Sequence, residues 1–227
     1  MRKLKLRSLS LNINGNYLIG VNAIATDTYS LVPLFASRKV MRKLTDNLKI
    51  DVFKASIFGS GLLGLFCVGN SKGLLITDLI FEEELEKIKE LLNNINVNTI
   101  PIKLSAIGNL ISANDFGAVV SPLIPDKFIP LIESTLGVKA QKIDVPIPTI
   151  GSLLLATNKG CIVSPLLSDE IAIKIEQILE VPTSRILSGK STPFYPKLYA
   201  LANSFGILFS PVLSGRIIME MWSGLFF

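Results

Sequence analysis

The sequence contains no histidine, only two cysteines and a single tryptophan in 227 residues. Without histidine the chain cannot build a Ser-His-Asp triad or a Cys-His pair, and it lacks the usual histidine ligands of zinc. The two cysteines and the lack of a secretory hydrophobic segment indicate a reducing, cytoplasmic setting without a disulfide framework. Cys67 and Cys161 are therefore expected to be small buried residues rather than nucleophiles.

Segments rich in proline, serine or glycine are also missing, so nothing in the composition marks a boundary between domains. Hydrophobic residues make up 49% of the chain, which is ample for a sizeable core. One uncharged run of 18 residues, 198–215, has the length at which a transmembrane helix becomes a candidate. However, it contains Asn203, Gly206 and Pro211, which do not suit a lipid-facing helix, so we predict no membrane span.

Charge is unevenly distributed along the chain, whose formal net charge is +5. Residues 1–54 carry ten Lys and Arg against three Asp, whereas residues 78–90 carry six Asp and Glu. A basic side could bind a polyanion such as RNA. A solvated surface that aids solubility explains the same pattern, and charge alone favours this simpler interpretation.

What the sequence does contain is one motif in five copies, spaced 43 to 46 residues apart. The leading positions are Gly20, Gly64, Gly108, Gly151 and Lys197. Six residues later come Thr26, Asn70, Asn114, Thr157 and Asn203, each preceded by a small residue: Ala25, Gly69, Ala113, Ala156 and Ala202. The closing positions are Tyr29, Gly73, Gly117, Gly160 and Gly206. A fixed period over the whole length indicates repeated supersecondary units.

Each repeat is predicted to contain three strands and a helix. The first strands are expected at residues 3–11, 50–57, 99–107, 140–147 and 185–195. A second strand follows the leading glycine, as at 65–69 and 152–156, and the Asn/Thr-x-x-Gly step then forms a hairpin turn. Third strands are expected at 74–76, 118–120, 161–163 and 207–209.

Amphipathic helices are expected after the third strands. The clearest is capped by Ser168, and another begins at Ser37. A helix that starts near Phe81 has one charged face, and Pro130 should make the third helix start late or lose a backbone bond. The fifth helix, 216–222, is predicted to be short and to end in an apolar tail.

These elements predict an α/β fold in a single domain. A helix in every unit excludes a propeller with four-stranded blades, and a small residue at one position of every copy suggests backbones crowded around an axis. We therefore predict a five-fold pseudosymmetric ring of βββα repeats, with inner strands around the axis and helices outside. The repeats cover approximately residues 1–48, 49–93, 94–137, 138–181 and 182–227.

Few residues in the chain suggest chemistry. Asp27 and Asp115 are expected to form satisfied Asx turns, and the five Asn and Thr positions to serve folding rather than to line a polar channel. Lys72 and Lys159 could meet phosphate, although exposed lysines are common in turns. Residues 59–64 match a dinucleotide fingerprint only superficially, because they lead into a short strand. The sequence thus predicts no enzyme, no cofactor, no metal and no small-molecule substrate.

Three segments nevertheless resemble a known family: Val68-Gly-Asn-Ser-Lys-Gly-Leu-Leu75, Ala106-Ile-Gly-Asn-Leu-Ile-Ser-Ala-Asn-Asp-Phe-Gly-Ala-Val-Val120 and Gly151-Ser-Leu-Leu-Leu-Ala-Thr-Asn-Lys-Gly160. They are similar to the archaeal and eukaryotic translation initiation factor 6 family of ribosome anti-association factors. The resemblance covers the whole chain and implies the pentein fold, a five-unit α/β ring.

The resemblance also implies a steric function. Members of the family bind the large ribosomal subunit near the sarcin–ricin loop, chiefly through ribosomal proteins with rRNA alongside. There they prevent premature joining of the small subunit, and they take part in initiation and in large-subunit maturation. For this chain we accordingly expect a cytoplasmic monomer that acts without catalysis.

The family's ribosome-facing end lies just after the leading glycines, which implies that Asn109, and less clearly Leu62 and Leu65, contact the ribosome. A local turn role for Asn109 is an equally good explanation. The chain departs from the family at several points: position 65 is commonly basic in relatives but is Leu here, and Lys197 replaces the fifth leading glycine. Val120-Ser-Pro122 and Val163-Ser-Pro165 stand where the family often has Val-His-Pro, and the tail 222–227 has no clear match.

Two other functions stay open. The first is a general RNA-binding ring that uses the basic residues Arg38, Lys39, Arg42 and Lys43. The second is a guanidino-modifying pentein enzyme, such as a deiminase or an amidinotransferase. Those enzymes use a Cys nucleophile with His and carboxylates, so a chain without histidine makes this alternative the weakest.

Overall fold

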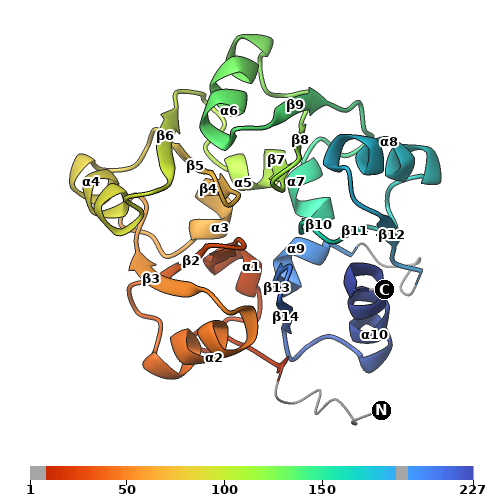
Figure 1. The fold of residues 1–227 in the computed structure, drawn as a ribbon, viewed down its shortest axis with the longest axis horizontal. Coiled ribbons are helices and arrows are strands. Elements are labelled where there is room, and N and C mark those ends of the chain that lie inside the picture. Colours follow the sequence, from red (N-terminus) through yellow and green to blue (C-terminus); the bar gives the residue numbers. More distant parts are fainter. Residues whose placement is uncertain (1–8, 188–193, 227) are drawn as a thin grey trace.

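The computed structural model of the chain describes residues 9–187 and 194–226. Its strands and helices form a ring of small sheets around a central axis, as predicted (Figure 1). The inner strands of neighbouring sheets contact one another around the axis, and the longer helices lie outside. The five-fold α/β ring expected from the repeats is confirmed.

Four of the sheets share one plan, in which an antiparallel hairpin is joined by a third, parallel strand. The third strand comes from the start of the following repeat, after the chain has crossed over through an outer helix. The four sheets are β1 (Ile24–Ala25), β2 (Tyr29–Pro33) and β3 (Asp51–Ala55); β4 (Cys67–Gly69), β5 (Gly73–Thr77) and β6 (Asn96–Ile100); β7 (Ile111–Ala113), β8 (Gly117–Val120) and β9 (Lys139–Lys142); and β10 (Leu154–Ala156), β11 (Cys161–Val163) and β12 (Thr183–Arg185).

The fifth sheet closes the ring. It consists of β13 (Ala200–Asn203) and β14 (Gly206–Phe209), which pair antiparallel. Ser10 forms a parallel bridge with Phe209, and the backbone N–H of Leu11 donates to the Phe209 carbonyl at 2.7 Å. Residues 10 and 11 therefore take the place of the parallel third strand that each of the other sheets receives from the following repeat.

The outer helices are α2 (Arg38–Leu48), α4 (Glu82–Leu91), α6 (Ile129–Leu136), α8 (Asp169–Leu179) and α10 (Gly215–Phe226). The predicted caps are present, because the Ser37 and Ser168 hydroxyls each accept a hydrogen bond from a first-turn N–H at 3.3 Å. Pro130 lies in the first turn of α6, where it has no backbone bond to lose. The predicted short fifth helix is wrong: α10 continues through the apolar tail, since Met221 and Leu225 extend its buried stripe.

Five short helices near the axis were not predicted: α1 (Ile19–Asn22), α3 (Leu63–Phe66), α5 (Ile107–Leu110), α7 (Ile150–Leu153) and α9 (Pro196–Tyr199). Each contains a leading position, so the inner strands begin later than expected. The glycines are needed here because the short helices pack backbone to backbone. A Cβ at Gly64 would overlap the Gly20 carbonyl, and a Cβ at Gly108 would overlap the Gly64 carbonyl.

The predicted opening strands also extend too far toward the C-terminus. β6 ends at Ile100 and β9 at Lys142, and part of the segment 185–195 lies outside the described residues. Proline explains the early end of β6, because Pro101 follows directly and cannot donate to a strand ladder.

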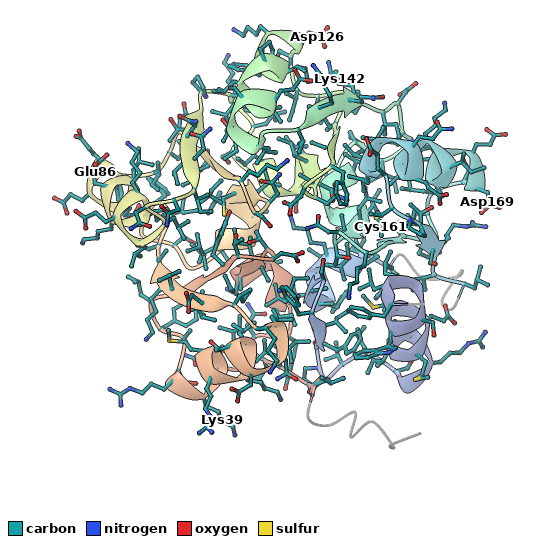
Figure 2. All side chains as sticks on the ribbon, viewed as in Figure 1. Lys39, Glu86, Asp126, Lys142, Cys161 and Asp169 are labelled. Carbon is teal, nitrogen blue, oxygen red and sulfur yellow. The ribbon has the colours of Figure 1, made fainter. Side chains whose placement is uncertain are left out.

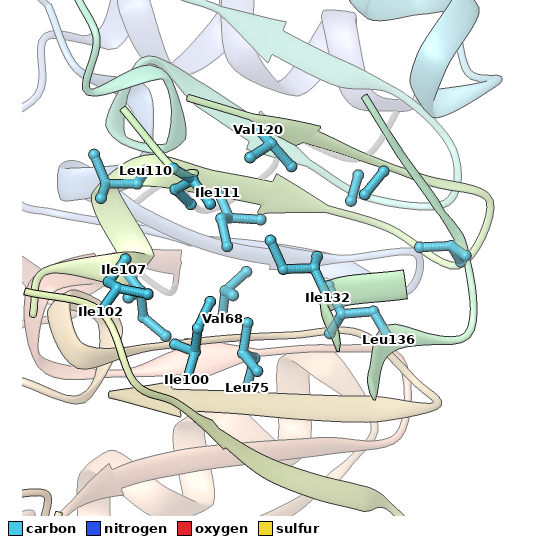
Figure 3. Packing of buried hydrophobic residues seen from close by; sticks show 14 residues of the cluster. Val68, Leu75, Ile100, Ile102, Ile107, Leu110, Ile111, Val120, Ile132 and Leu136 are labelled. Atoms are coloured by element: carbon cyan, nitrogen blue, oxygen red, sulfur yellow. The ribbon is translucent and has the colours of Figure 1, made fainter. Parts of the chain in front are cut away.

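Among the described residues the hydrophobic core is divided into five clusters, each of which lies between two neighbouring sheets. In the cluster of Figure 3, Val68, Leu75 and Ile100 of one sheet face Ile132 and Leu136 of the next repeat's helix. Another cluster joins the ends of the chain, because Leu201 and Leu208 pack with Leu44 and Leu48. No sheet has a core of its own, so burial of apolar surface requires the whole ring.

No helix in the described part of the chain is long and apolar enough to cross a membrane. The uncharged run 198–215 instead contains β13 and β14, and all residues of these two strands are buried.

Asparagine side chains connect neighbouring repeats at the hairpin turns. The Asn70 amide donates to the carbonyls of Asn114 at 2.9 Å and Leu136 at 2.8 Å, both in the next repeat. Its oxygen accepts hydrogen bonds from the N–H groups of its own turn.

Two further asparagines repeat this arrangement. Asn114 bonds Thr157 and Leu179, and Asn203 bonds Thr26 and Leu48 across the closure of the ring. The leucine in each pair is the last residue of an outer helix, so the amide satisfies a carbonyl that the helix leaves unpaired. Within the described ranges, the hydroxyls of Thr26 and Thr157 bond only their own turns.

We predict that Asn203→Thr destabilises the ring without disrupting the turn. Threonine supports the same turn at Thr157, but it has no amide to donate to Thr26 and Leu48. Two buried carbonyls lose their donor, which should lower the free energy of unfolding by about 2–4 kcal/mol in equilibrium denaturation. Asn94→Thr, at an exposed position, is the matched control. A decrease below about 0.5 kcal/mol would show that the amide does not hold the ring closed.

Candidate binding face

The three residues predicted to contact the ribosome lie together at one end of the ring. Asn109 is in α5, Leu65 is in α3, and Leu62 directly precedes α3. The two short helices pack against each other, and a Cβ at Gly108 would lie only 3.0 Å from the Leu65 carbonyl. All three side chains are half-buried, which leaves each of them partly accessible.

The side chain of Asn109 makes no hydrogen bond with any described residue, in contrast to the asparagines of the hairpin turns. Its backbone N–H donates to Ala106 at 2.9 Å, which closes the helical turn without help from the amide. A local capping role, the alternative explanation for this asparagine, is therefore not observed. The amide is available to a partner.

The loop that leads into α3 is held by one carboxylate. Glu84 of α4 accepts hydrogen bonds from the Ser56 hydroxyl at 2.5 Å and from the N–H groups of Phe58 at 2.7 Å and Gly59 at 2.9 Å. Phe58 and Gly59 both have positive φ, at 56° and 65°, as the two central residues of a tight hairpin turn require. The carboxylate thus fixes a strained turn at the edge of the candidate face.

These contacts also determine the ionisation of Glu84. Burial by itself would raise the pKa of this carboxyl, but hydrogen bonds from the Ser56 hydroxyl and from the N–H groups of Gly59, Phe81 and Phe58 outweigh it. The net result is a lowered pKa. The turn is therefore held most firmly when Glu84 is ionised.

Sequence reasoning missed a group of exposed aromatic side chains on the first two repeats. Phe58 is 51% exposed, and its ring centroid lies 5.2 Å from that of Phe81, which is also exposed. The equivalent turn one repeat earlier, Asn14-Gly15, again has positive φ, and the Asn14 amide donates to the carbonyl of exposed Phe35 at 3.0 Å. The available signal was a residue-Gly pair at a spacing of 44 before the first two leading glycines.

The opposite end of the axis carries a polar collar, made of Asp27, Ser71, Asp115, Asn158 and Ser204. The Asn158 amide donates to Asp27 at 2.8 Å and to Asp115 at 2.6 Å. The other oxygen of each carboxylate accepts a backbone N–H of a neighbouring repeat at 2.8 Å. The predicted Asx turns are thus wrong for Asp27 and Asp115, because the preceding Asn or Thr forms the turn and the aspartates link repeats.

The described residues contain no cluster of three or more His, Cys, Asp or Glu arranged to hold a metal ion. Cys67 and Cys161 are both buried, as expected, and burial raises the pKa of each thiol, to about 12 for Cys67. Residues 59–62 lead into the short helix α3, so the expectation that this segment leads directly into a strand is wrong; α3 has only four residues and β4 follows it.

The rim of the ring carries helices of opposite charge. Arg38, Lys39 and Arg42 are exposed on α2, whereas α4 presents Glu82, Glu83 and Glu86. In Figure 2, Lys39 and Glu86 point outward from the rim. Two lysines are less available to a phosphate than the sequence suggested, because their ammonium groups bond the backbone. Lys43 donates to the Ser10 carbonyl, and Lys72 donates to the Asp115 carbonyl at 3.0 Å.

Comparison with known proteins identifies related sequences. The sequence profile of the eIF-6 family matches residues 8–186. Translation initiation factor 6 of Methanothermobacter thermautotrophicus is 35% identical over 128 residues, which cover 56% of this chain and 57% of the relative. The proteins of the same name from Methanocaldococcus jannaschii and Nitrosopumilus maritimus are 38% and 34% identical over 127 and 121 residues. The alignments span a little over half of each relative's length, 57%, 55% and 54% respectively.

A solved structure is also similar, at 12% identity. It is the N-terminal domain of ArgZ, a C264S mutant bound to substrate, described as an arginine dihydrolase from the ornithine-ammonia cycle in cyanobacteria. The TM-score is 0.46, and the match covers 82% of this chain and 76% of that chain. A similarity of this size says nothing about the chemistry of the present chain.

We predict that Glu84→Gln weakens the fold at neutral pH and that the difference disappears in acid. Because the folded state lowers the pKa of Glu84, its contribution is present above the usual value of 4.5 and is lost as pH falls through the folded value. Denaturation at pH 7 should therefore find the variant less stable, with a gap that narrows progressively as the pH falls below 4.5. Glu86→Gln, on the same helix but away from the turn, should match the wild type. A gap independent of pH would contradict this role of the carboxylate.

Proposed function

The chain belongs to the eIF-6 family, and from this membership we propose that it is a translation initiation factor that binds the large ribosomal subunit. Bound there, it prevents premature joining of the small subunit by occupying the surface between them. It acts in the cytoplasm as a monomer, in initiation and in maturation of the large subunit. The observation that carries this proposal is the family match over residues 8–186, which includes the candidate face.

The geometry is compatible with a steric mechanism. The short helices α3 and α5 are packed backbone to backbone around the axis, so the face that contains Asn109, Leu62 and Leu65 is rigid. Half-buried leucines beside an unpaired amide offer apolar contact together with a hydrogen bond, which suits protein surfaces more than phosphate. We therefore propose ribosomal proteins near the sarcin–ricin loop as the main contacts, with rRNA alongside.

The decisive experiment is sedimentation with separated ribosomal subunits. We expect the purified protein to migrate with isolated large subunits and not with small ones. Large subunits incubated with it first should form fewer joined ribosomes when small subunits are added. A protein that stays at the top of the gradient would overturn the proposal.

Substitution at α5 tests which end of the ring docks. Asn109→Arg should weaken binding to large subunits about tenfold or more, because it places a bulky charge within a packed contact. Phe116→Arg adds the same side chain at an exposed turn beyond the other end of β7 and should leave binding unchanged. Circular dichroism should show both variants folded. Equal affinities for the two variants would remove Asn109 from the binding face.

The exposed basic side chains of α2 support a second candidate function, a general RNA-binding ring. The double variant Lys39→Glu, Arg42→Glu should remove weak, salt-dependent binding to naked rRNA. The slope of log K against log salt should decrease by roughly 0.9 for each phosphate that the protein no longer neutralises. Under our first proposal, this variant still binds whole large subunits more tightly than naked rRNA. Equal wild-type affinity for naked rRNA and for whole subunits would favour the second function.

A further inference from the structure

Lys197 breaks the pattern of the axis. The other four leading positions are glycines, and at each of them a Cβ would overlap or crowd a backbone carbonyl of a neighbouring short helix. Lys197 begins at the same position of the fifth repeat, in α9, and its side chain turns into the axial cavity. Its ammonium donates a hydrogen bond to the Gly108 carbonyl in α5, two repeats away.

This ammonium has no carboxylate partner in the part of the chain that the structure describes. No ion pair involving Lys197 occurs among residues 9–187 and 194–226, and the residues that line the cavity include neither Asp nor Glu. Protein surrounds the half-buried side chain, and this burial lowers the pKa of Lys197 to about 8. At neutral pH the axis therefore holds a cation without a protein counter-charge, which is an unfavourable arrangement unless something compensates it.

The cavity beside Lys197 offers a second donor. Its volume is about 70 Å³, which is enough for several water-sized particles. Ser112 lines it at only 7% exposure, and the Ser112 hydroxyl makes no hydrogen bond with the described residues. Cys67 lines it as well, but its thiol donates to the Leu63 carbonyl at 3.0 Å and stays protonated, because burial raises its pKa to about 12.

We propose that the axial cavity is a binding site for a small monovalent anion such as chloride, held by the Lys197 ammonium and the Ser112 hydroxyl. Positive charge, a free hydroxyl donor and apolar walls without carboxylates are the features that such an ion requires. Phosphate esters are excluded, because the cavity is small and offers only these two side-chain donors. The Asp27 and Asp115 carboxylates occupy the other end of the axis and repel anions, so the ion enters from the end of the short helices.

Thermal unfolding in sodium chloride, sodium bromide and sodium gluconate at equal ionic strength tests this site. Gluconate is too large for the cavity and controls for screening at the surface. At halide concentrations about tenfold above the dissociation constant, the wild-type midpoint should rise by about 2–4 °C relative to gluconate. The rise should shrink above about pH 8, where Lys197, the one group lining the cavity that titrates in this range, loses its charge.

Two variants separate the site from general salt effects. Lys197→Met keeps the length of the side chain without the charge and should abolish the difference between halide and gluconate, while Ser112→Ala should reduce it. Crystals of the wild-type protein grown in bromide provide a measurement that does not depend on variants. They should show anomalous scattering within hydrogen-bonding distance of the Lys197 ammonium. An equal halide effect in Lys197→Met, or a cavity without bromide, would overturn the proposal.

Discussion

The side-chain amide of asparagine is the interaction on which the ring depends. At three of the five hairpin turns it holds its own turn through the oxygen and two carbonyls of the next repeat through the nitrogen. One of those carbonyls ends an outer helix, and the closing glycine allows that helix to approach, since a Cβ at Gly73 or Gly117 would overlap the helix backbone. Asn and Gly therefore act as a pair: the glycine allows the end of the outer helix to approach, and the asparagine amide bonds the last carbonyl of that helix. Because every core cluster lies between two sheets, this registration of one repeat against the next also determines how apolar surface is buried.

The two repeats with threonine show how the same joint is made without the amide. In the first repeat the closing glycine is replaced by Tyr29, whose hydroxyl donates to the Gly73 carbonyl of the next repeat at 3.0 Å. The tyrosine ring is buried, and this burial raises the pKa of its hydroxyl, so it stays a donor. In the fourth repeat the connection is by backbone contact, because a Cβ at Gly160 would lie 2.7 Å from the Gly224 carbonyl of α10. The pseudosymmetry is thus one of position, and different side chains satisfy the same geometric requirement.

The repeated local patterns could be predicted from the sequence, whereas the contacts between repeats could not. The period, the small residues at the axis, the third strands and the caps at Ser37 and Ser168 are local patterns, and the structure contains them. The short helices around Gly64 and its equivalents were predicted as strands, because four residues are too few for a helical pattern and their stability comes from neighbours. The contacts of Glu84 with its turn and of Asn158 with two aspartates join residues 25 to 131 positions apart, and only the closed ring brings them together. The candidate face could be predicted only through the resemblance, since a half-buried asparagine after a glycine has no distinctive pattern of its own.

Under the proposed function the protein acts by occupying a docking surface, which requires a fixed shape more than chemistry, and the axis of this ring supplies one. The leading glycines cannot carry side chains, because each fits against a carbonyl of the neighbouring short helix. The residues beside them, such as Leu65 and Asn109, are partly exposed on the same short helices, so their side chains are less constrained. The face can therefore change its specificity residue by residue while the glycines keep its geometry constant. The fifth leading position is the exception, because Lys197 extends a side chain inward. This departure from the repeat pattern therefore lies on the axis rather than on the face proposed to meet the ribosome.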